Sequence, residues 1–371
     1  MAGASGECHP THLSSSELGT KEYWETFYSR TLTHIATKPN SNRSRSPNLA
    51  RASEGTNENE DDDDDDEEEE DEYNADSDPG TSWFAEHNAP AKVLDFLTGE
   101  AFPLAPCRTL KVPASTTTTT TTTTTRRASG SGGLRRERKT ARPLNSEERQ
   151  AQPSILDLGT GNGSMLALLR KRGGFRGEMV GVDYSAKSVE LARELQRSRR
   201  HEAYLSGSED EDEDESEGED DAETEADAEG EGRRDTEEAE EWDEIRFEEW
   251  DILSSADDLR SEGLDWFPYE KGGFDIVLDK GTFDAVSLMV EKSECERYPR
   301  IAGSLVRKGG FLIVTSCNWT EEEVVQWFTS IPAGGESQAA ELVVWGRVQY
   351  PRFRFGGQEG QGVCTVCFQR V

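Results

Sequence analysis

The sequence predicts an α/β fold with a mostly parallel sheet and helices on both of its faces. From residue 154 onward, short apolar runs typical of strands alternate with amphipathic runs that have helical spacing. A glycine-rich turn separates the first of these strands from the first helix, which is where open α/β sheets bind ligands. Long acidic and threonine-rich runs interrupt the pattern, and we expect these insertions to be disordered.

The negative charge of the chain is concentrated in two segments. The 371 residues carry a formal net charge of −35. Residues 53–78 hold 17 Asp or Glu and no Lys or Arg, and residues 209–241 hold 21 acids against two arginines. Runs with so little apolar surface cannot offset the entropy lost on ordering. We therefore expect both to be solvated spacers, which leaves a nearly neutral folded part.

We expect one folded domain that is divided by these insertions. The predicted segments are a disordered N-terminus (1–17), a helix of the domain (18–36), an acidic disordered insertion (37–81), a lid and helix segment (82–104), a low-complexity linker with ten consecutive threonines (105–150), and an α/β core (151–371) with a further acidic disordered insertion at about 199–244.

Two helices are expected ahead of the core. In "LGTKEYWETFYSR", Thr20 is placed to cap a helix, and the aromatic residues that follow recur at helical spacing, which is typical of packing. In "SWFAEHNAPAKVLDFL", Val93, Leu94 and Leu97 give the second helix an apolar face.

Seven strands are expected in the core. The first five are "SILDLG", "EMVGVD", "IRFEEWDI", "FDIVLDKG" and "FLIVTSCN", and "ELVVWGRV" and "VCTVCFQRV" supply two more. The fourth run is apolar almost throughout, as expected of a strand buried on both faces of the sheet. Ser185 starts the helix after the second strand, and Thr320 with Glu323 forms a capping box for the helix "EEEVVQWF".

Cysteine and histidine patterns predict no metal centre. Cys364 and Cys367 are an odd number of positions apart in a strand-like run, which puts their thiols on opposite faces of the sheet. The five histidines have no metal-ligand spacing with the cysteines or with one another. We see neither a signal peptide nor an apolar run long enough to span a bilayer, so we expect an intracellular protein.

The turn at residues 159–163, "GTGNG", is the predicted nucleotide-binding loop. Glycine permits positive φ angles and a close approach of the backbone to a ligand, and the helix that starts near Gly163 offers unpaired N–H groups. Asp183 ends the second strand, where a carboxylate accepts hydrogen bonds from ribose hydroxyls. Asp251 and Ile252 follow the third strand, beside the expected position of an adenine ring.

The spacing of this turn favours S-adenosylmethionine over NAD. A dinucleotide turn has its third glycine one residue later, against the pyrophosphate. Asp157 lies two residues before the first glycine, where a carboxylate repels a pyrophosphate and attracts the ammonium group of a methionine moiety. NAD-dependent oxidoreduction remains an alternative, although no Tyr-x-x-x-Lys or similar hydride-handling set occurs near the fourth or fifth strand.

Seven blocks of the sequence resemble a known enzyme family. They are "LGTKEYWETFY", "SWF", "ILDLGTGNG", "GVDYS", "DIVLDKGTFDAVSL", "LIVTSCNWT" and "PRFRFGG", and in this order they are similar to the seven-strand methyltransferases that modify a lysine of translation elongation factor 1-alpha. The resemblance implies a Rossmann-like fold, S-adenosylmethionine as cofactor and elongation factor 1-alpha as protein partner. It further implies a location in the cytoplasm, with the nucleus as a second location. We also expect a monomer with neither a nucleic-acid nor a membrane partner, because the folded part is nearly neutral and no apolar run is long enough to span a bilayer.

The same resemblance implies roles for individual residues. Asp157, Gly159, Thr160, Gly161 and Gly163 would hold the methionine portion of the cofactor, Asp183 and Tyr184 the ribose, Asp251 and Ile252 the adenine, and Trp83 part of the lid. Asp279 in "LDKGT" would face the transferred methyl group as the catalytic residue. Phe84, Asn318 and Trp319 would contact the substrate.

Methyl transfer to an amine requires a neutral lysine in line with the sulfonium. Neutralising a lysine of pKa near 10.4 at pH 7 costs about 4–5 kcal/mol. Repulsion by the sulfonium and desolvation in an aromatic channel both lower that pKa, so no strong general base is required. We expect Asp279 to orient the amine, and Trp83, Phe84 and Trp319 to wall the channel. A structural acid at position 279 and a packed ring at position 319 are the alternatives.

Two other functions stay open at this point. A methyltransferase of the same fold could act on RNA or a small molecule, although the near-neutral folded part lacks the basic face that RNA calls for. A catalytically silent scaffold could use its acidic segments to recruit basic partners, although the acids at 157, 183, 251 and 279 occur together.

Overall fold

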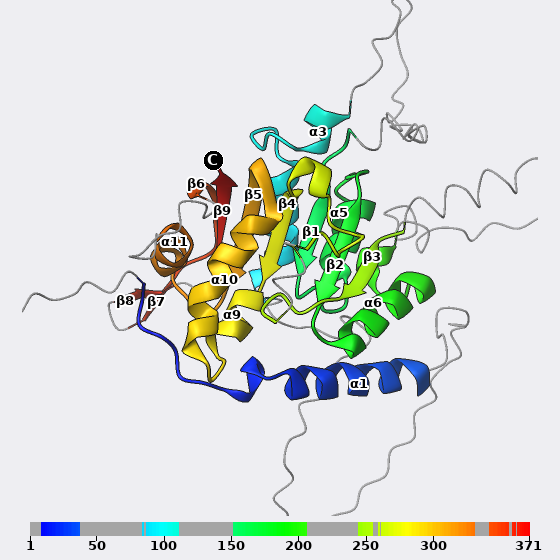
Figure 1. Ribbon diagram of the computed structural model, residues 1–371, viewed down its shortest axis with the longest axis horizontal. Helices are drawn as coiled ribbons and strands as arrows, with labels where there is room; N and C mark the ends of the chain where they lie inside the picture. Colours follow the sequence, from blue (N-terminus) through cyan, green and yellow to red (C-terminus); the bar gives the residue numbers. More distant parts are fainter. Residues whose placement is uncertain are drawn as a thin grey trace, which may run out of the picture.

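A seven-stranded sheet forms the centre of the molecule (Figure 1). The computed structural model describes residues 9–37, 84, 87–110, 151–205, 244–254, 259, 261–330, 341–355, 358–360 and 362–371. The strand order is β3-β2-β1-β4-β5-β9-β6. The first five strands of this order run parallel, and β9 is antiparallel to both β5 and β6. The predicted fold class and its seven strands are confirmed.

The strands coincide with the predicted apolar runs. They are β1 (Ile155–Leu158), β2 (Met179–Asp183), β3 (Arg246–Glu249), β4 (Phe274–Lys280), β5 (Val306–Ser316), β6 (Leu342–Val348) and β9 (Cys364–Arg370). A separate antiparallel pair joins β7 (Phe353–Phe355) to β8 (Gln358–Gly360). This pair was not predicted, because three residues are too few to show an alternating pattern.

Helices cover both faces of the sheet. They are α1 (Lys21–Thr37), α2 (Ala89–Thr98), α3 (Pro106–Thr109), α5 (Ser164–Lys171), α6 (Ala186–Ser198), α9 (Thr282–Ser287), α10 (Lys292–Leu305) and α11 (Glu321–Thr329), with short 3-10 turns η1 (Glu17–Gly19), η4 (Glu202–Tyr204) and η5 (Tyr269–Lys271). The predicted caps are present: Ser185 accepts from the Ser188 N–H, and Thr320 and Glu323 form a capping box.

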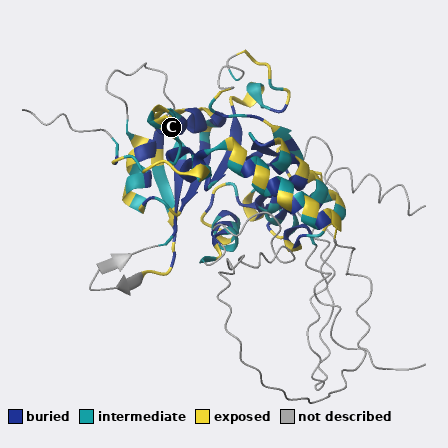
Figure 2. Ribbon diagram, turned by 90° about the horizontal axis from the view of Figure 1, so that it is seen from below, coloured by how far each residue is buried: buried dark blue, intermediate teal, exposed yellow. Residues whose placement is uncertain are grey.

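Side chains alternate along the strands between two hydrophobic cores. Ile155 and Ile276 face the core built with α1, α2, α5 and α6. Leu156 and Val277 face the core built with α9, α10 and α11. Figure 2 shows these buried strands between the partly exposed helices. Cys364 lies in the second core and Cys367 in the first, which confirms that the two thiols point to opposite faces.

The predicted boundaries of the disordered segments need correction at three places. Residues 9–17 have a defined position, and the Ser16 N–H donates to the Leu288 carbonyl at 3.0 Å. Helix α3 and a hydrogen bond between Thr109 and Gln152 order the start of the predicted linker. Tyr204 of η4 is buried, and its hydroxyl donates to the Asn162 carbonyl at 3.1 Å. In each case, contacts distant in sequence fix a short polar segment. The rest of the predicted insertions lies outside the described residues.

Helix α1 lies across the end of the sheet where the parallel strands finish, and α3 lies at the opposite end, where they start (Figure 1). The turn that follows β2 contacts α1 and the residue before it, because the Tyr184 hydroxyl donates to the Thr20 carbonyl at 3.2 Å and the Ala186 N–H donates to Glu25. Helix α1 therefore covers the carboxyl ends of the parallel strands. None of the described helices is both long and apolar enough to span a bilayer.

Candidate active site

A cavity of about 460 Å³ lies where the parallel strands end. Its walls include the residues after β1, β2, β3 and β4 together with residues of α1, α9 and α10. This volume is typical of small-molecule sites. From β1 the chain continues outward on one side of the sheet, to β2 and β3, and then returns to the other side, to β4 and β5. The cavity therefore lies at the point where the strand order reverses.

The glycine turn forms one wall of this cavity. Gly159 and Gly161 both have a φ of 58°, and Gly163 has a φ of 74°. A Cβ atom on Gly159 would lie 2.2 Å from Thr282 Oγ1, and the Thr282 hydroxyl itself donates to the Leu158 carbonyl at 2.6 Å. Gly159, Thr160 and Gly161 line the cavity. Gly163 lies behind it as the N-cap of α5, and a Cβ atom on it would lie 2.5 Å from the Tyr204 hydroxyl.

Asp183 holds the turn in place from the end of β2. One carboxylate oxygen accepts from the Gly161 N–H at 3.1 Å and from the Ser188 hydroxyl at 2.8 Å, and the other accepts from the Ser185 N–H at 2.9 Å. Burial raises the pKa of Asp183, and these hydrogen bonds oppose the rise. The side chain lines the cavity, as the sequence predicts for a ribose ligand.

Asp157 lies beneath the turn instead of lining the cavity. Its carboxylate accepts from the Thr160 hydroxyl at 3.0 Å and is 3% exposed. Burial raises its pKa to about 7, and the positive charge of Lys280 opposes the rise. The structure therefore gives Asp157 a supporting position behind the loop, and the direct contact with a methionine moiety that the sequence predicts stays a prediction.

The residues after β3 form the opposite wall. Asp251 and Ile252 both line the cavity, together with Tyr184. Asp251 accepts from the Leu253 N–H at 2.9 Å and from the Ser254 hydroxyl at 2.7 Å, which fixes its carboxylate at the strand exit. Ile252 is 9% exposed and offers an apolar surface beside it. This pair has the chemistry expected next to an adenine amine and ring.

Asp279 is held by three hydrogen bonds within the protein, as the alternative of a structural acid predicts, and its role facing the methyl group stays a prediction. One carboxylate oxygen accepts from the N–H groups of Thr282 and Phe283 at 3.0 and 3.1 Å, and the other accepts from the Tyr298 hydroxyl at 2.8 Å. The side chain is 1% exposed, and burial raises its pKa to about 7. Asp279 therefore organises the start of α9, whereas the next residue, Lys280, lines the cavity.

Trp319 also differs from the prediction of a channel wall. Its ring is 5% exposed and lies 6.1 Å from the Phe283 ring at an interplanar angle of 26°. Its other neighbour is Trp327, at 5.6 Å. Trp319 is thus part of the core beneath α11, because the tight turn after β5 directs the ring inward.

The cavity wall does not include Phe84 or Asn318, the remaining predicted substrate residues, and the predicted lid residue lies outside the described part. Phe84 is buried, has a φ of 74°, and lies with its ring centroid 5.5 Å from Lys280 Nζ. The Asn318 N–H donates to the Ser316 hydroxyl at 3.2 Å, and its side-chain nitrogen is buried. Neither lines the cavity. Trp83 lies outside the described residues.

Sequence reasoning missed the contribution of α1. Lys21, Trp24 and Tyr28 line the cavity, although the aromatic spacing of this helix predicts packing alone. The rings do both, because Trp24 and Tyr28 also belong to the core on this face of the sheet. Their spacing of four residues puts both on one helix face, but only the position of α1 across the strand ends directs that face to the cavity.

The chemistry of this cavity fits S-adenosylmethionine. Carboxylates at two strand exits supply acceptors for hydroxyl and amine groups, and the glycine turn supplies backbone close to the ligand. Apolar surface from Trp24, Tyr28 and Ile252 surrounds them. Three cationic residues also line the cavity, Lys21, Lys280 and Arg297, and Lys280 Nζ lies 5.5 Å from the centroid of the Phe84 ring.

The fold and this site are similar to those of the Rossmann-like methyltransferases, enzymes that use S-adenosylmethionine. Residues 150–205 match the family described as "Methyltransferase domain". Within this class, the chain is related to protein-lysine N-methyltransferases. It is 26% identical over 361 residues to "Protein-lysine N-methyltransferase EFM4" of Saccharomyces cerevisiae, with 96% of each chain covered. It is 29% identical to human "EEF1A lysine methyltransferase 2" over 59% of this chain and 66% of the human protein.

Solved structures of similar fold include two methyltransferases. One is magnesium protoporphyrin IX methyltransferase from Synechocystis PCC 6803 with bound SAM, at 13% identity and a TM-score of 0.31 over 59% of this chain and 70% of that chain. The other is N-methyltransferase NodS from Bradyrhizobium japonicum WM9 with S-adenosyl-l-homocysteine, at 12% identity and a TM-score of 0.32 over 59% and 78%.

Proposed function

We propose that this chain transfers a methyl group from S-adenosylmethionine to a lysine side chain of translation elongation factor 1-alpha. One structural observation carries the proposal: the glycine turn, Asp183 and Asp251 converge on a single cavity that α1 covers. The substrate follows from the relatives, one named for lysine methylation in general and one for EEF1A. The yeast relative matches almost the whole chain, including the segments before the core.

Each wall of the cavity has its own part in this proposal. The turn at 159–161 and Asp183 would hold the amino-acid and ribose parts of the cofactor, and Asp251 with Ile252 the adenine. The bound cofactor supplies an electrophilic methyl group on a sulfonium. Trp24 and Tyr28 would exclude water from one side of the reaction, because their buried rings close the cavity along α1.

Lys280 gives the site a way to favour a neutral amine. An ammonium that approaches its charge is disfavoured by repulsion, and desolvation in the cavity acts in the same direction. Both lower the pKa of an incoming lysine, so positioning supplies much of the rate and no general base is needed. Asp279 would act through the backbone that carries Lys280 and Thr282, as a positioning residue.

Mass spectrometry of a reconstituted reaction tests the proposal. Purified chain, S-adenosylmethionine and elongation factor 1-alpha should yield a peptide whose mass increases by one or more methyl groups on a lysine. Asp183→Asn should lower the yield at least tenfold at limiting cofactor, because it removes one acceptor oxygen from the turn. Absence of cofactor binding by calorimetry in the folded wild-type chain would refute the proposal.

The alternative substrates give different results in the same assay. Labelled methyl groups that appear in RNA or in a small molecule, with none in the elongation factor, would favour the other methyltransferase functions. A cellular role that survives Asp183→Asn would favour a scaffold.

We also propose that the reaction takes place in the cytoplasm, where the elongation factor works, and fractionation of tagged protein tests this location.

A further inference from the structure

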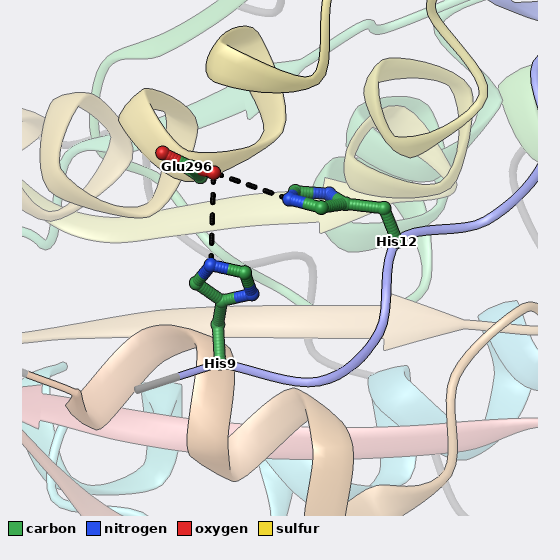
Figure 3. A group of neighbouring side chains, drawn as sticks. All are labelled: His9, His12 and Glu296. Carbon is green, nitrogen blue, oxygen red and sulfur yellow. Dashed lines mark hydrogen bonds and ion pairs between the residues drawn. The ribbon is translucent and has the colours of Figure 1, made fainter. Parts of the chain in front are cut away.

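Three metal-ligating side chains meet on the surface near the N-terminal segment (Figure 3). His12 Nε2 lies 3.1 Å and His9 Nε2 lies 3.6 Å from the same oxygen, Oε1 of Glu296 on α10. The ligand atoms of all three lie within 4.8 Å of one another. The sequence does not reveal this cluster, because Glu296 is more than 280 positions from the histidines and their mutual spacing is uninformative.

The hydrogen bond of His9 creates a conflict that a cation would resolve. Its Nδ1 lies 2.9 Å from the Pro10 carbonyl, which can only accept, so Nδ1 carries the proton. In a neutral imidazole the other nitrogen, Nε2, then presents a lone pair, and this lone pair faces a carboxylate oxygen. Two acceptors in this position repel each other unless a positive charge lies between them. A second proton on His9 or a bound metal ion would supply that charge.

The surroundings favour a metal ion. A ring N–H donated to a backbone carbonyl is the usual arrangement behind a metal-ligating histidine, because it fixes the tautomer and the ring orientation. The His9 ring stacks on Trp327 at 4.8 Å and 9°, and the His12 ring lies 5.4 Å from the same indole. Both imidazoles are thus held in position before any ion binds. Glu296 has a side chain that is 50% exposed, so an ion can reach the cluster from solvent.

Distances and ligand types indicate zinc. Bond lengths of about 2.0–2.2 Å in a tetrahedral site place neighbouring ligand atoms about 3.3 Å apart. The two distances to the Glu296 oxygen, 3.1 and 3.6 Å, bracket this value. Two imidazoles and one carboxylate suit Zn²⁺ better than Mg²⁺ or Ca²⁺, which prefer oxygen ligands alone. A fourth position would remain for water.

We infer that His9, His12 and Glu296 form a Zn²⁺ site that clips the N-terminal segment onto α10. This segment continues directly into the cavity wall: the Ser16 N–H donates to Leu288, and the Trp24 indole donates to the Leu18 carbonyl at 2.8 Å. A bound ion would fix the N-terminal end of the segment that leads into α1. Metal binding itself does not depend on the proposed function, whereas its effect on cofactor affinity does.

Calorimetry on the full chain tests the site. The chain is first treated with a chelator, then titrated with ZnCl₂ at neutral pH in excess MgCl₂, which saturates the carboxylate-rich segments. We expect one zinc ion per chain, and loss of that binding in the double variant His9→Ala, His12→Ala. Glu296→Gln should weaken zinc binding at least tenfold. His34→Ala, on α1 and outside the cluster, is the matched control and should bind zinc like the wild type.

Thermal unfolding and cofactor titration complete the test. Zinc should raise the melting temperature of the wild type and of His34→Ala but not of the double variant, because a ligand stabilises only a folded state that binds it. Zinc should also tighten S-adenosylmethionine binding in the wild type and in His34→Ala, and leave it unchanged in the double variant. Equal zinc binding in the double variant, or none in the wild type, overturns the site. Zinc binding without an effect on cofactor affinity overturns the coupling and leaves the site and the proposed function standing.

Discussion

Two glycines with the same backbone conformation differ in what surrounds them. Gly159 in the ligand turn and Gly174 after α5 have φ angles of 58° and 75°. A Cβ on Gly159 would overlap the Thr282 hydroxyl, whereas a Cβ on Gly174 would meet nothing within 4 Å. Alanine substitutions at these two glycines therefore distinguish two free-energy costs: that of a non-glycine residue with a positive φ angle, and that of a side chain inserted between β1 and α9.

We expect Gly159→Ala to abolish measurable cofactor binding and Gly174→Ala to preserve it. Both variants lose about 1 kcal/mol from the unfavourable φ angle. Only Gly159→Ala also displaces Thr282, and with it the wall of the cavity. Calorimetry with S-adenosylmethionine and urea unfolding of both variants measure the two effects. Equal cofactor affinity in the two alanine variants would contradict the role given to this turn.

Asp279 should make stability depend on pH. Burial raises its pKa to about 7, from an ordinary value near 4. Between these values the folded chain keeps a proton that the unfolded chain has lost, so this residue's contribution to stability is complete below pH 4 and declines as pH rises through 7. The amide introduced by Asp279→Asn resembles the protonated acid and does not titrate.

The free energy of unfolding of Asp279→Asn should therefore fall less than that of the wild type between pH 5 and pH 8. Urea unfolding at both pH values measures the difference, with Asp95→Asn on an exposed position of α2 as the control. Parallel pH curves for Asp279→Asn and the wild type would show that the carboxyl stays ionised in the fold.

At the scale of elements, strand periodicity predicts which residues share a face but not which face meets a ligand. Asp279 and Lys280 are neighbours at the end of β4 and must point in different directions. The sequence favours the acid as the functional group, whereas the structure turns the acid toward Tyr298 and puts the lysine in the cavity wall. The choice depends on α10, which supplies Tyr298 and which no local pattern connects to β4.

The elements that the sequence predicts well are those whose signals are local. The capping box of α11 and the alternating Cys364 and Cys367 need only neighbouring residues, and both are confirmed. Asp183 and Asp251 lie at the predicted strand ends and line the cavity for the same reason. Helix α1 is predicted as a helix but not as a cavity wall, because its position over the sheet depends on contacts with residues far along the chain, such as Tyr184.

The hydroxyl of Tyr184 is one of the polar contacts that connect the start of α1 to the sheet, and a single substitution can remove it. Tyr184→Phe deletes its bond to the Thr20 carbonyl and keeps the ring at the cavity. A bond of this kind contributes about 0.5–1.5 kcal/mol, so cofactor affinity should fall about two- to tenfold.

Amide hydrogen exchange in α1 should become faster in Tyr184→Phe than in the wild type. Tyr23→Phe removes a hydroxyl from α1 itself, where the ring packs against Trp24 at 5.1 Å, and serves as the matched control. Exchange in α1 that is unchanged in Tyr184→Phe would show that the apolar contacts of the helix suffice to hold it.

At the scale of the whole molecule, the carboxyl ends of the parallel strands and their amino ends have different surroundings. The strand ends at Leu158, Asp183 and Lys280 face the cavity and α1. The strands start at the opposite end of the sheet (Figure 1). The described chain resumes there at residues 151 and 244, shortly before β1 and β3. Residues 151–154 and 244–245, where the described chain resumes, thus lie at the strand starts, away from the cavity.

This arrangement allows the largest charge on the chain to be removed without reaching the site. Residues 209–241 hold 21 acids against two arginines, and the described chain resumes at Glu244, one strand length before the cavity residue Asp251. Charges beyond about 10 Å from a site are largely screened at 0.1 M salt. Replacing 209–241 with a short glycine and serine linker should therefore leave the calorimetric Kd for S-adenosylmethionine within about a factor of two. The same replacement should weaken any attraction to basic proteins, which a salt series of binding to polylysine would detect. A tenfold change in cofactor affinity would instead show that the charges of this segment reach the cavity at the strand ends.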